Sequence, residues 1–428
     1  MFSTMIVSLK KYNQINQLLI ILIACTIVFR NICTPIIIVF LLFNLLHYKF
    51  IKIEKKHLKD ILIISSPLLM SILFFFNNET ISGGFKSVEK LLTLIIFPLF
   101  VLTNKNLNIN FILNQYRVWF LLILVGFLVR FVLIFPDKIE KYSKGIDLIE
   151  VGYQYAISLG SHAPLLNLQV GFLCIIHFYF LIQSIIKKNF LKIWINIFLF
   201  FITFSLVLII NTRITLLVVI LCIMIVLVKE LLLLYSLKKT LIGLFSGLFV
   251  TIVIVGGYVQ LNPYMYEKYS SVTFAHMDKV GRLDEIKNPE VVVFNALVTR
   301  VSIWKSSVEV AKDHLPFGTG AELGKKTLFD YYKKTNQHFL AKYEFPVHNQ
   351  FLDFTIKFGI IGFIVCCIYI FFPFYKSADL LNFKSLFICL GTIFFISNLT
   401  DDFLIRFDGI VFSGLFYSLF SSISTFKK

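Results

Sequence analysis

One histidine and two arginines, far apart in this chain of 428 residues, are the side chains best suited to chemistry. His348 lies directly before a long apolar run that begins at Leu352. An unperturbed imidazole titrates near pH ~6.5, so it can accept a proton at neutral pH and release it later. Arg213 lies in a short turn before an apolar run, and Arg300 lies in the longest polar segment. Guanidinium groups stay charged and offer several donors, which suits bidentate binding of a phosphate.

Each of these residues has a structural interpretation when taken alone. Arg213 could extend to lipid headgroups, and the shortness of its turn leaves the two interpretations equally open. Arg300 lies four residues before Trp304, so an indole contact worth ~0.5–1 kcal/mol is the alternative to phosphate binding. A single histidine is more often structural than catalytic. The position of His348, after a proline and before an apolar run, favours a catalytic base.

Three further cations lie near the ends of apolar runs, namely Arg130, Lys357 and Arg406. Charge at membrane depth is costly and suggests function by default. Lys357 follows Asp353 by four residues, so a helical ion pair explains it equally well. Arg130 and Arg406 are accessory candidates that would widen an electropositive site, and Asn349, beside the histidine, is another.

The sequence does not predict a metal site or a disulfide framework. Asp401 and Asp402 are adjacent, so their side chains are expected to diverge, and we predict that one of them caps a helix ahead of Phe403. The turn Gly160–His162 could contact a carrier lipid, but a plain connection is favoured. The seven cysteines lie in or beside apolar runs without CxxC spacing, which is typical of buried thiols.

The composition excludes a soluble globular protein, because 58% of the residues are hydrophobic, 15% are charged and the mean hydropathy is +0.84. A helix that crosses a ~30 Å hydrocarbon core needs about 20 apolar residues. The chain has about twelve such runs, which predict an all-α, multi-pass membrane protein. The predicted spans are 14–29, 33–48, 59–76, 87–103, 117–135, 162–186, 190–210, 213–229, 240–259, 352–373, 383–398 and 403–421.

The net charge of +17 indicates topology and not nucleic-acid binding. The 260–351 segment is nearly balanced, with 12 Lys and Arg against 10 Asp and Glu, and the excess positive charge lies in short connections such as 49–59 and 187–192. Short lysine-rich loops mark the cytoplasmic side. We therefore predict that both termini are cytoplasmic and that 260–351 lies outside, between membrane parts 1–259 and 352–428.

The 260–351 segment has its own helical pattern. Apolar residues at helical spacing predict one helix over 291–314, and a second is expected from Lys326 to about Tyr343. Gly318 to Gly320 should form a flexible turn between them. Two amphipathic helices over the mouth of a helical bundle would form a lid or a shelf.

The ordered motifs of this region resemble the O-antigen ligase and polymerase superfamily of bacterial envelope glycosyltransferases. The resemblance covers about residues 200–375, and the number of predicted spans favours the ligase branch, which joins O-antigen to lipid A–core. The motifs are Asn211-Thr212-Arg213, Arg300-Val-Ser-Ile-Trp304, Leu315-Pro316-Phe-Gly318-Thr-Gly320, His348-Asn349-Gln350-Phe351-Leu352 and Gly359-Ile-Ile-Gly362.

The resemblance implies a glycan donor on undecaprenyl pyrophosphate, a sugar hydroxyl as acceptor, and a site on the periplasmic face of the bacterial inner membrane. The paired arginines of the family match Arg213 and Arg300, and its loop-end histidine matches His348. Trp304 and Asn349 would be accessory residues. Members of the family work without a metal or nucleotide, so no cofactor is expected.

Other activities share these features. A polymerase would use a second carrier-linked repeat unit as its acceptor, and a protein-glycosylating relative would use a polypeptide. A flippase or transporter of lipid-linked sugar is the rival from another class. Transporters commonly contain two related halves with polar sites near the midplane. The chain has no such similarity between its halves, and its candidate cations cluster toward one face.

Overall fold

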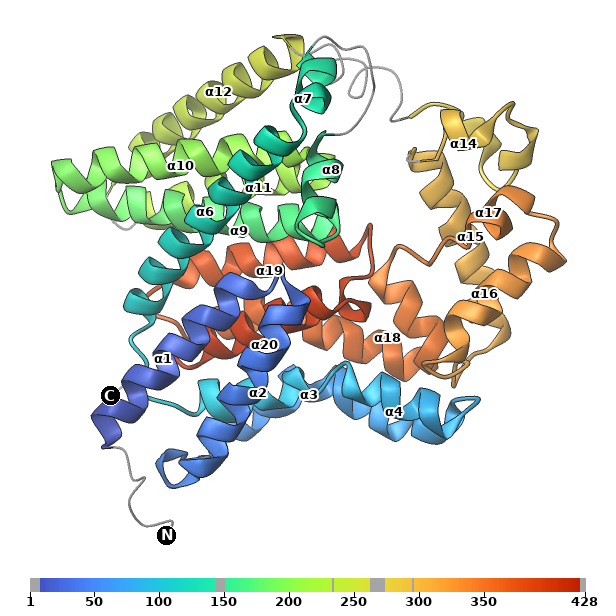
Figure 1. The fold of residues 1–428 in the computed structure, drawn as a ribbon, viewed down its shortest axis with the longest axis horizontal. Helices are drawn as coiled ribbons and strands as arrows, with labels where there is room; N and C mark the ends of the chain where they lie inside the picture. The colour runs from blue at the N-terminus through green and yellow to red at the C-terminus, as the bar shows by residue number, and fades with distance from the viewer. Residues whose placement is uncertain (1–7, 144–150, 233–234, 262–273, 295, 424–428) are drawn as a thin grey trace.

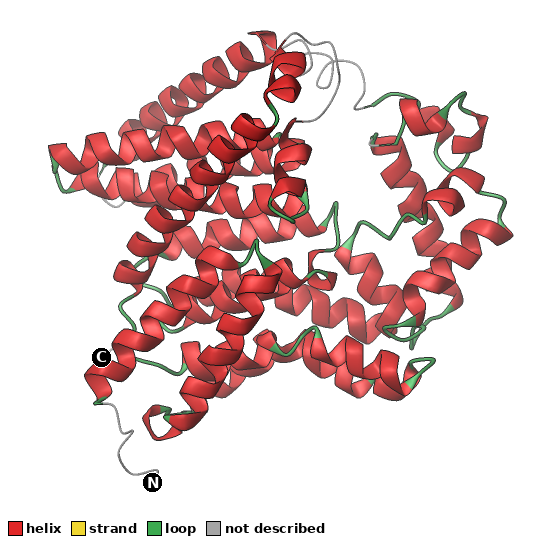
Figure 2. Cartoon of the chain, viewed as in Figure 1, coloured by secondary structure: helices red, strands yellow, loops and turns green. Residues whose placement is uncertain are grey.

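The structure is a computed structural model that describes residues 8–143, 151–232, 235–261, 274–294 and 296–423. These residues form helices and loops without strands, as Figure 2 shows. The prediction of an all-α protein is confirmed. Each predicted apolar run coincides with helical structure. The helices that correspond to these runs are α1 (Leu9–Thr26), α2 (Arg30–Leu46), α3 (Lys55–Leu73), α6 (Ile109–Ile134), α9 (Ala163–Ile186), α10 (Phe190–Ile210), α11 (Arg213–Leu231), α12 (Leu237–Leu261), α18 (Gln350–Ser377), α19 (Lys384–Asn398) and α20 (Phe407–Ser421).

Six helices among the described residues are long and apolar enough to cross a bilayer, namely α6, α9, α10, α11, α12 and α18. Shorter apolar helices form at α2, α19 and α20. The fourth predicted run is interrupted, since it is divided among α4 (Ile81–Glu89), α5 (Thr93–Phe97) and a π-helical segment at Pro98–Leu102. The last run begins with a single 3-10 turn, Phe403–Ile405, before α20. The predicted runs are therefore helical, but they differ in length and continuity.

Helix α9 is the centre of the bundle. In its apolar stretch of 18 residues 94% are buried, whereas the corresponding share for α12 is 7%. It packs against α10, α11 and α19. A Cβ atom at Gly171 would come within 2.9 Å of the Thr215 side chain, so the glycine permits the close approach of α11. The N-terminus of α11 is thereby held against the most buried helix.

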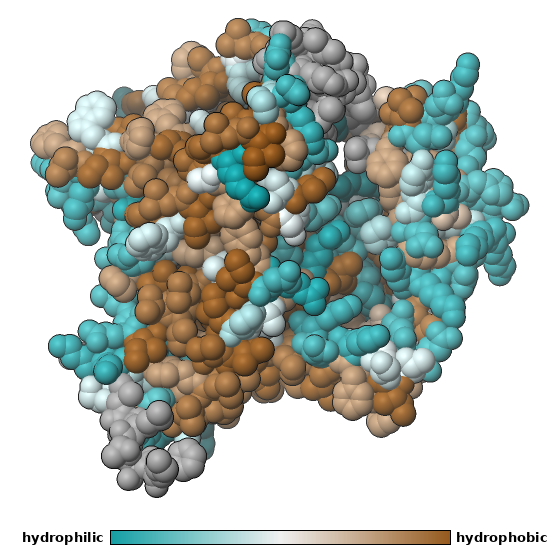
Figure 3. Space-filling view, viewed as in Figure 1, coloured by the Kyte–Doolittle hydropathy of each residue, from teal (hydrophilic) through white to brown (hydrophobic). Residues whose placement is uncertain are grey.

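The segment after α12 forms a separate helical unit, which we call the lid and define as residues 274–294 and 296–349. It contains α14 (Pro289–Val292), α15 (Leu297–Asp313), α16 (Leu323–Lys334) and α17 (His338–Tyr343). The lid lies on the right of the bundle in Figure 1, and both termini lie on the left. Figure 3 shows mostly polar residues over the lid and apolar residues over much of the bundle.

The lid has its own apolar core, to which the bundle contributes Ile356 of α18. Buried side chains of α15, α16 and α17, including Ile303, Leu328 and Leu340, pack together there. The helices are shorter than the two predicted from the sequence. The first principal helix begins at Leu297, and Asn336, which has φ +55°, interrupts the second.

The predicted flexible turn between these helices is fixed to the bundle. Helix α18 is interrupted at Gly359, whose φ of 64° and ψ of −148° are not helical. The lid segment Pro316–Gly320 lies against this interruption and exchanges backbone hydrogen bonds with α18. We call this arrangement the clamp. It joins the lid to a helix that crosses the bundle.

Candidate active site

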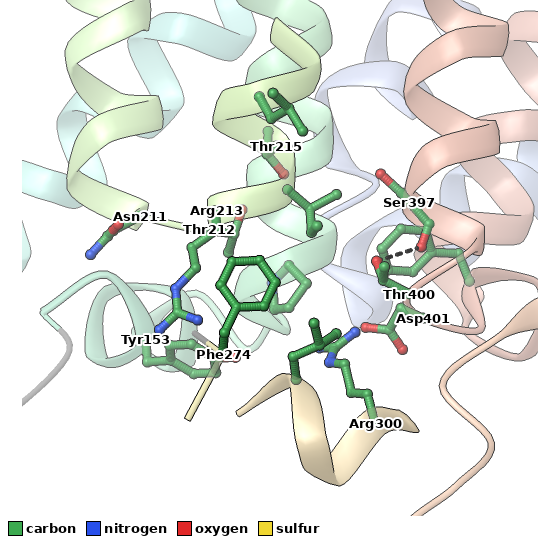
Figure 4. Close-up of a pocket in the computed structure, with 15 residues that line it drawn as sticks. Tyr153, Asn211, Thr212, Arg213, Thr215, Phe274, Arg300, Ser397, Thr400 and Asp401 are labelled. Carbon is green, nitrogen blue, oxygen red and sulfur yellow. Dashed lines mark hydrogen bonds between the residues drawn. The ribbon is translucent and has the colours of Figure 1, made fainter. Parts of the chain in front are cut away.

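A pocket of about 430 Å³ lies where the lid meets the bundle. Three helices that each contribute a first-turn residue to its lining are α9 through Pro164, α11 through Arg213 and α15 through Leu297. Free backbone N–H groups and the helix dipole make such termini favourable for anions. Figure 4 shows the pocket residues. The complete lining is Tyr153, Pro164, Asn211–Thr215, Leu217, Phe274, Leu297, Arg300, Ser397, Thr400, Asp401 and Phe403.

Arg213 and Arg300 line this pocket from two different walls (Figure 4). Arg213 is the first residue of α11, and Arg300 lies in the first turn of α15. Neither guanidinium forms a salt bridge or hydrogen bond with another described residue, and the Nε atom of Arg213 is buried. Among the described lining residues two are positively charged and one, Asp401, is acidic, so the pocket keeps an excess of positive charge that favours an anion.

The alternative interpretation of Arg300 is not supported. Within the described part of the chain, its guanidinium makes no contact with the ring of Trp304. The indole Nε1–H instead donates a hydrogen bond of 3.1 Å to the backbone carbonyl oxygen of His348. Trp304 therefore ties α15 to the residue that the sequence marks as a base.

His348 lies beside the pocket and is joined to it through Asp401. Its Nδ1 atom is 3.3 Å from Oδ1 of Asp401, which lines the pocket. The backbone of His348 has φ +51°, a conformation that is uncommon for a residue with a side chain. Asn349 follows it and fixes the loop, since its side chain caps α18 at the N–H of Leu352 and donates to the carbonyl oxygen of Leu399.

The Asp401 carboxylate is suited to orient the His348 ring. Burial acts to raise the pKa of Asp401, but its hydrogen bond with the His348 ring, together with the charge of Arg300, holds it below its usual range. Oδ1 also accepts the backbone N–H of Asp402 at 2.9 Å. An ionised Asp401 would hold the proton of the imidazole on Nδ1 and leave Nε2 as the acceptor.

The prediction that Asp401 or Asp402 caps a helix is wrong. Asp402 precedes the 3-10 turn, but its side chain makes no capping hydrogen bond. Both of its oxygens are buried and have no hydrogen-bond partner among the described residues. Burial, followed by the charge of Asp401, raises the pKa of Asp402 well above its usual value, which favours the protonated side chain.

The side chains of His348, Asp401 and Asp402 are also close enough to be compared with a metal site. One ligand atom from each lies within 4.8 Å of the others. Imidazole and carboxylates can bind divalent cations, although Oδ1 of Asp401 is already bonded to two of its neighbours. The adjacent aspartates could suggest a metal pair from the sequence, but spacing does not bring His348 to them, and the expectation of a metal-free site stays a prediction.

The accessory cations lie outside the pocket lining. Arg130 is exposed, with its guanidinium 5.8 Å from the ring centroid of Phe127 on the same helix. Lys357 forms the ion pair with Asp353, at 2.7 Å, that the sequence offered as an alternative. Arg406 precedes α20 without a salt bridge to any described residue, and its Nε is buried.

His162, in a turn that the sequence treats as a plain connection, belongs to the surroundings of the site. Burial and the positive charge of Arg406 lower the pKa of His162 to about 4, so its ring is neutral at pH 7. Its Nδ1 is buried without a hydrogen-bond partner in the described part of the chain. Sequence spacing has no signal for this contact, because the turn before α9 and the turn before α20 are far apart along the chain.

The fold is that of a multi-pass helical membrane protein, and the pocket at one end of its bundle is lined by two arginines. A protein-family model described as O-antigen ligase matches residues 198–367, and this match supports membership of the O-antigen ligase superfamily. The matched segment contains Arg213, Arg300, His348 and the clamp, and it ends before Asp401. None of the curated proteins compared with the chain matches it. Membership supports a glycan-transferring enzyme of the O-antigen ligase type that uses a lipid-linked glycan and an acceptor.

Proposed function

We propose that the protein transfers O-antigen or a related glycan from undecaprenyl pyrophosphate to a sugar hydroxyl of lipid A–core. The single observation that carries this proposal is the arrangement of Arg213 and Arg300, which line one pocket without salt-bridge partners among the described residues. Asp401, which holds His348, lines the same pocket. Two arginines in the pocket and a base beside it meet the two requirements for displacing a diphosphate by a hydroxyl.

On the donor side, the two guanidinium groups bind the diphosphate and stabilise the charge that develops when it leaves. Cleavage of the bond between the anomeric carbon and the diphosphate oxygen places negative charge on that oxygen. A preorganised donor in a site shielded from water contributes roughly 2.7–4 kcal/mol to such a step. The N-termini of α9, α11 and α15 add their partial positive charges at the same pocket.

On the acceptor side, His348 removes the proton of the attacking hydroxyl through Nε2. Its Nδ1–H donates to Asp401, which stabilises the imidazolium that forms. General-base catalysis of this kind contributes ~10²–10⁴ in rate. The imidazolium then returns its proton to water. Because one bond to the anomeric carbon forms as the other breaks, a single displacement inverts that centre. Every step is assigned to side chains, so the proposed reaction is metal-independent.

The distribution of charge supports a periplasmic site in the bacterial inner membrane. The lysine-rich short connections would be cytoplasmic, and the lid and the termini lie at opposite sides of the molecule (Figure 1). Both termini would then be cytoplasmic. Nucleotide sugars are not expected outside the cytoplasm, which agrees with a donor carried by a lipid.

A transfer assay with purified protein tests the proposal. The protein in detergent is mixed with undecaprenyl-pyrophosphate-linked glycan and lipid A–core, and a shift of the lipid A–core band reports ligation. Joining of donor glycans to each other would indicate a polymerase, and joining to a polypeptide would indicate a protein O-oligosaccharyltransferase. Movement of intact donor across vesicles, without any joined product, would contradict transfer and support a flippase.

Analysis of lipids from a deletion strain separates the first two outcomes in cells. Loss of a ligase leaves long polymer on the carrier and bare core. Loss of a polymerase leaves core capped with one repeat unit.

A further inference from the structure

The clamp connects two parts of the molecule that are far apart in the sequence. The N–H of Thr319 donates to the carbonyl oxygen of Ile356 and the N–H of Gly320 donates to that of Lys357, both at 2.8 Å. In the other direction, the N–H of Ile360 donates to the carbonyl oxygen of Pro316 at 3.0 Å. The lid thus satisfies backbone groups that the interruption of α18 would otherwise leave without partners.

Only glycine fits at the centre of this contact. The φ and ψ of Gly359 lie in a region that other residues essentially do not occupy. A Cβ atom there would overlap the Pro316 carbonyl oxygen, and a Cβ atom at Gly318 would approach the Gly359 nitrogen to 2.6 Å. The two backbones are therefore in direct contact, and a single methyl group would separate them.

The clamp and the base are attached to different supports. The His348 loop is tied to the bundle, since Asn349 bonds Leu399 and the Gln350 side chain accepts the N–H of Leu404 at 2.7 Å. Arg300 has no such tie. Its helix, α15, is held by packing against the outer half of α18, by Trp304 and by the clamp that begins soon after its end.

We infer that Gly359 and the segment Pro316–Gly320 are positioning residues that set the place of Arg300 opposite His348 and Arg213. This inference rests on the proposed function. Releasing the clamp would let α15 shift on α18, while Arg213 stays on α11 and His348 stays on its bundle contacts. A displacement of about 1 Å can cost ~10²-fold in rate. Breaking the contact between Gly359 and Pro316–Gly320 should therefore remove the contribution of Arg300 to the transfer rate and leave the contributions of Arg213 and His348.

A double-mutant cycle tests this inference in the transfer assay. We expect Gly359→Ala to lower transfer ~10²-fold by misplacing the guanidinium. Adding Arg300→Ala should lower it no more than about threefold further, because the contribution of that residue is already lost. Adding Arg213→Ala should multiply the two losses, because that arginine has a separate support. Gly126→Ala on α6, where a Cβ atom meets nothing within 4 Å, is the matched control and should transfer normally.

General damage to the fold would give a different pattern. It would multiply with both arginine substitutions, and that result would overturn the inference, as would normal transfer by Gly359→Ala. If Gly359→Ala fails to fold, Thr319→Val replaces it in the cycle, because it removes only the hydrogen bonds from Oγ1 to the carbonyl oxygens of Ile356, at 3.1 Å, and Gly320, at 3.4 Å. We expect a loss of about threefold, which again does not multiply with Arg300→Ala. Absence of transfer by the wild type would refute the proposed function instead.

Discussion

Arg213 and Arg300 are the same residue type in the same pocket, but the molecule supports them in different ways. Arg213 begins a helix that packs directly on α9, the most buried helix among the candidate spans. Arg300 lies in a polar unit outside the bundle, which is held by packing against α18, by the clamp and by the bond from Trp304 to His348. Arg213 is therefore held in place by the packing of the bundle alone, whereas the position of Arg300 depends on the contacts that join the lid to the bundle. The comparison shows that two identical side chains in one pocket can be positioned by very different sets of contacts.

The largest effect on transfer is expected for substitution of His348, the proposed base. His348→Ala should lower transfer by ~10²–10⁴, because the hydroxyl loses its base. Abundance and melting temperature in detergent should stay at wild-type values. His338→Ala, which changes an exposed histidine of the lid, is the matched control. Full transfer by His348→Ala would remove the base from the proposed mechanism.

Substitution of the two arginines tests the comparison directly. Each of Arg213→Ala and Arg300→Ala should lower transfer ~10²–10³-fold, because each removes a preorganised donor to the leaving diphosphate. Lysine at either position should restore only part of the rate, since it lacks the planar fork. Arg282→Ala, on an exposed lid arginine paired with Glu285, should have no effect. Normal rates in both alanine variants would leave the diphosphate site without support.

The two adjacent aspartates should respond differently in spite of their positions. Asp401→Asn should lower transfer ~10–10²-fold, because the amide no longer holds the imidazolium. Asp402→Asn should keep most of the activity, since burial and the charge of Asp401 raise the pKa of Asp402 and the uncharged amide resembles its protonated form. Equal losses in the two variants would contradict this division of roles.

The pH dependence of stability gives a second test of Asp402. A carboxyl group whose pKa is raised in the folded state binds more protons there than in the unfolded state. Its contribution therefore lowers the stability of the wild type as the pH rises from ~4 toward the folded pKa. Asp402→Asn lacks this group, so its melting temperature should exceed that of the wild type increasingly over this range. Parallel curves would show that Asp402 is not neutral in the folded protein.

The smallest effect is expected for a cation outside both walls. Arg130→Gln should transfer at the wild-type rate, because its guanidinium is exposed beside Phe127 and does not line the pocket. A loss above about threefold would exceed what a surface substitution explains and would place Arg130 in the site.

The sequence predicts the helices and the two arginines of the pocket, because apolar runs and motif order lie along the chain. It offers the Lys357–Asp353 pair for the same reason, since both residues belong to one helix. The partner of His348 is 53 residues away, on another turn, and no periodicity links them. The clamp is missed in the same way, since Gly318–Gly320 has the composition of a flexible turn and becomes fixed only by contact with α18. Spacing predicts contacts within an element, whereas contacts between elements depend on packing.

The exposure of Leu217 indicates a route by which a lipid-linked substrate could enter the pocket. Leu217 lines the pocket one turn below Arg213, yet it is 61% exposed on a helix long enough to cross the bilayer. The pocket is therefore accessible from the side of the bundle at Leu217, while the lid covers it at Leu297 and Arg300. An isoprenoid tail could remain dissolved among the acyl chains while only its head turns inward. The lipid would then not have to leave the bilayer before the reaction. The pocket would have to hold only the head of the donor, whatever the length of the attached glycan.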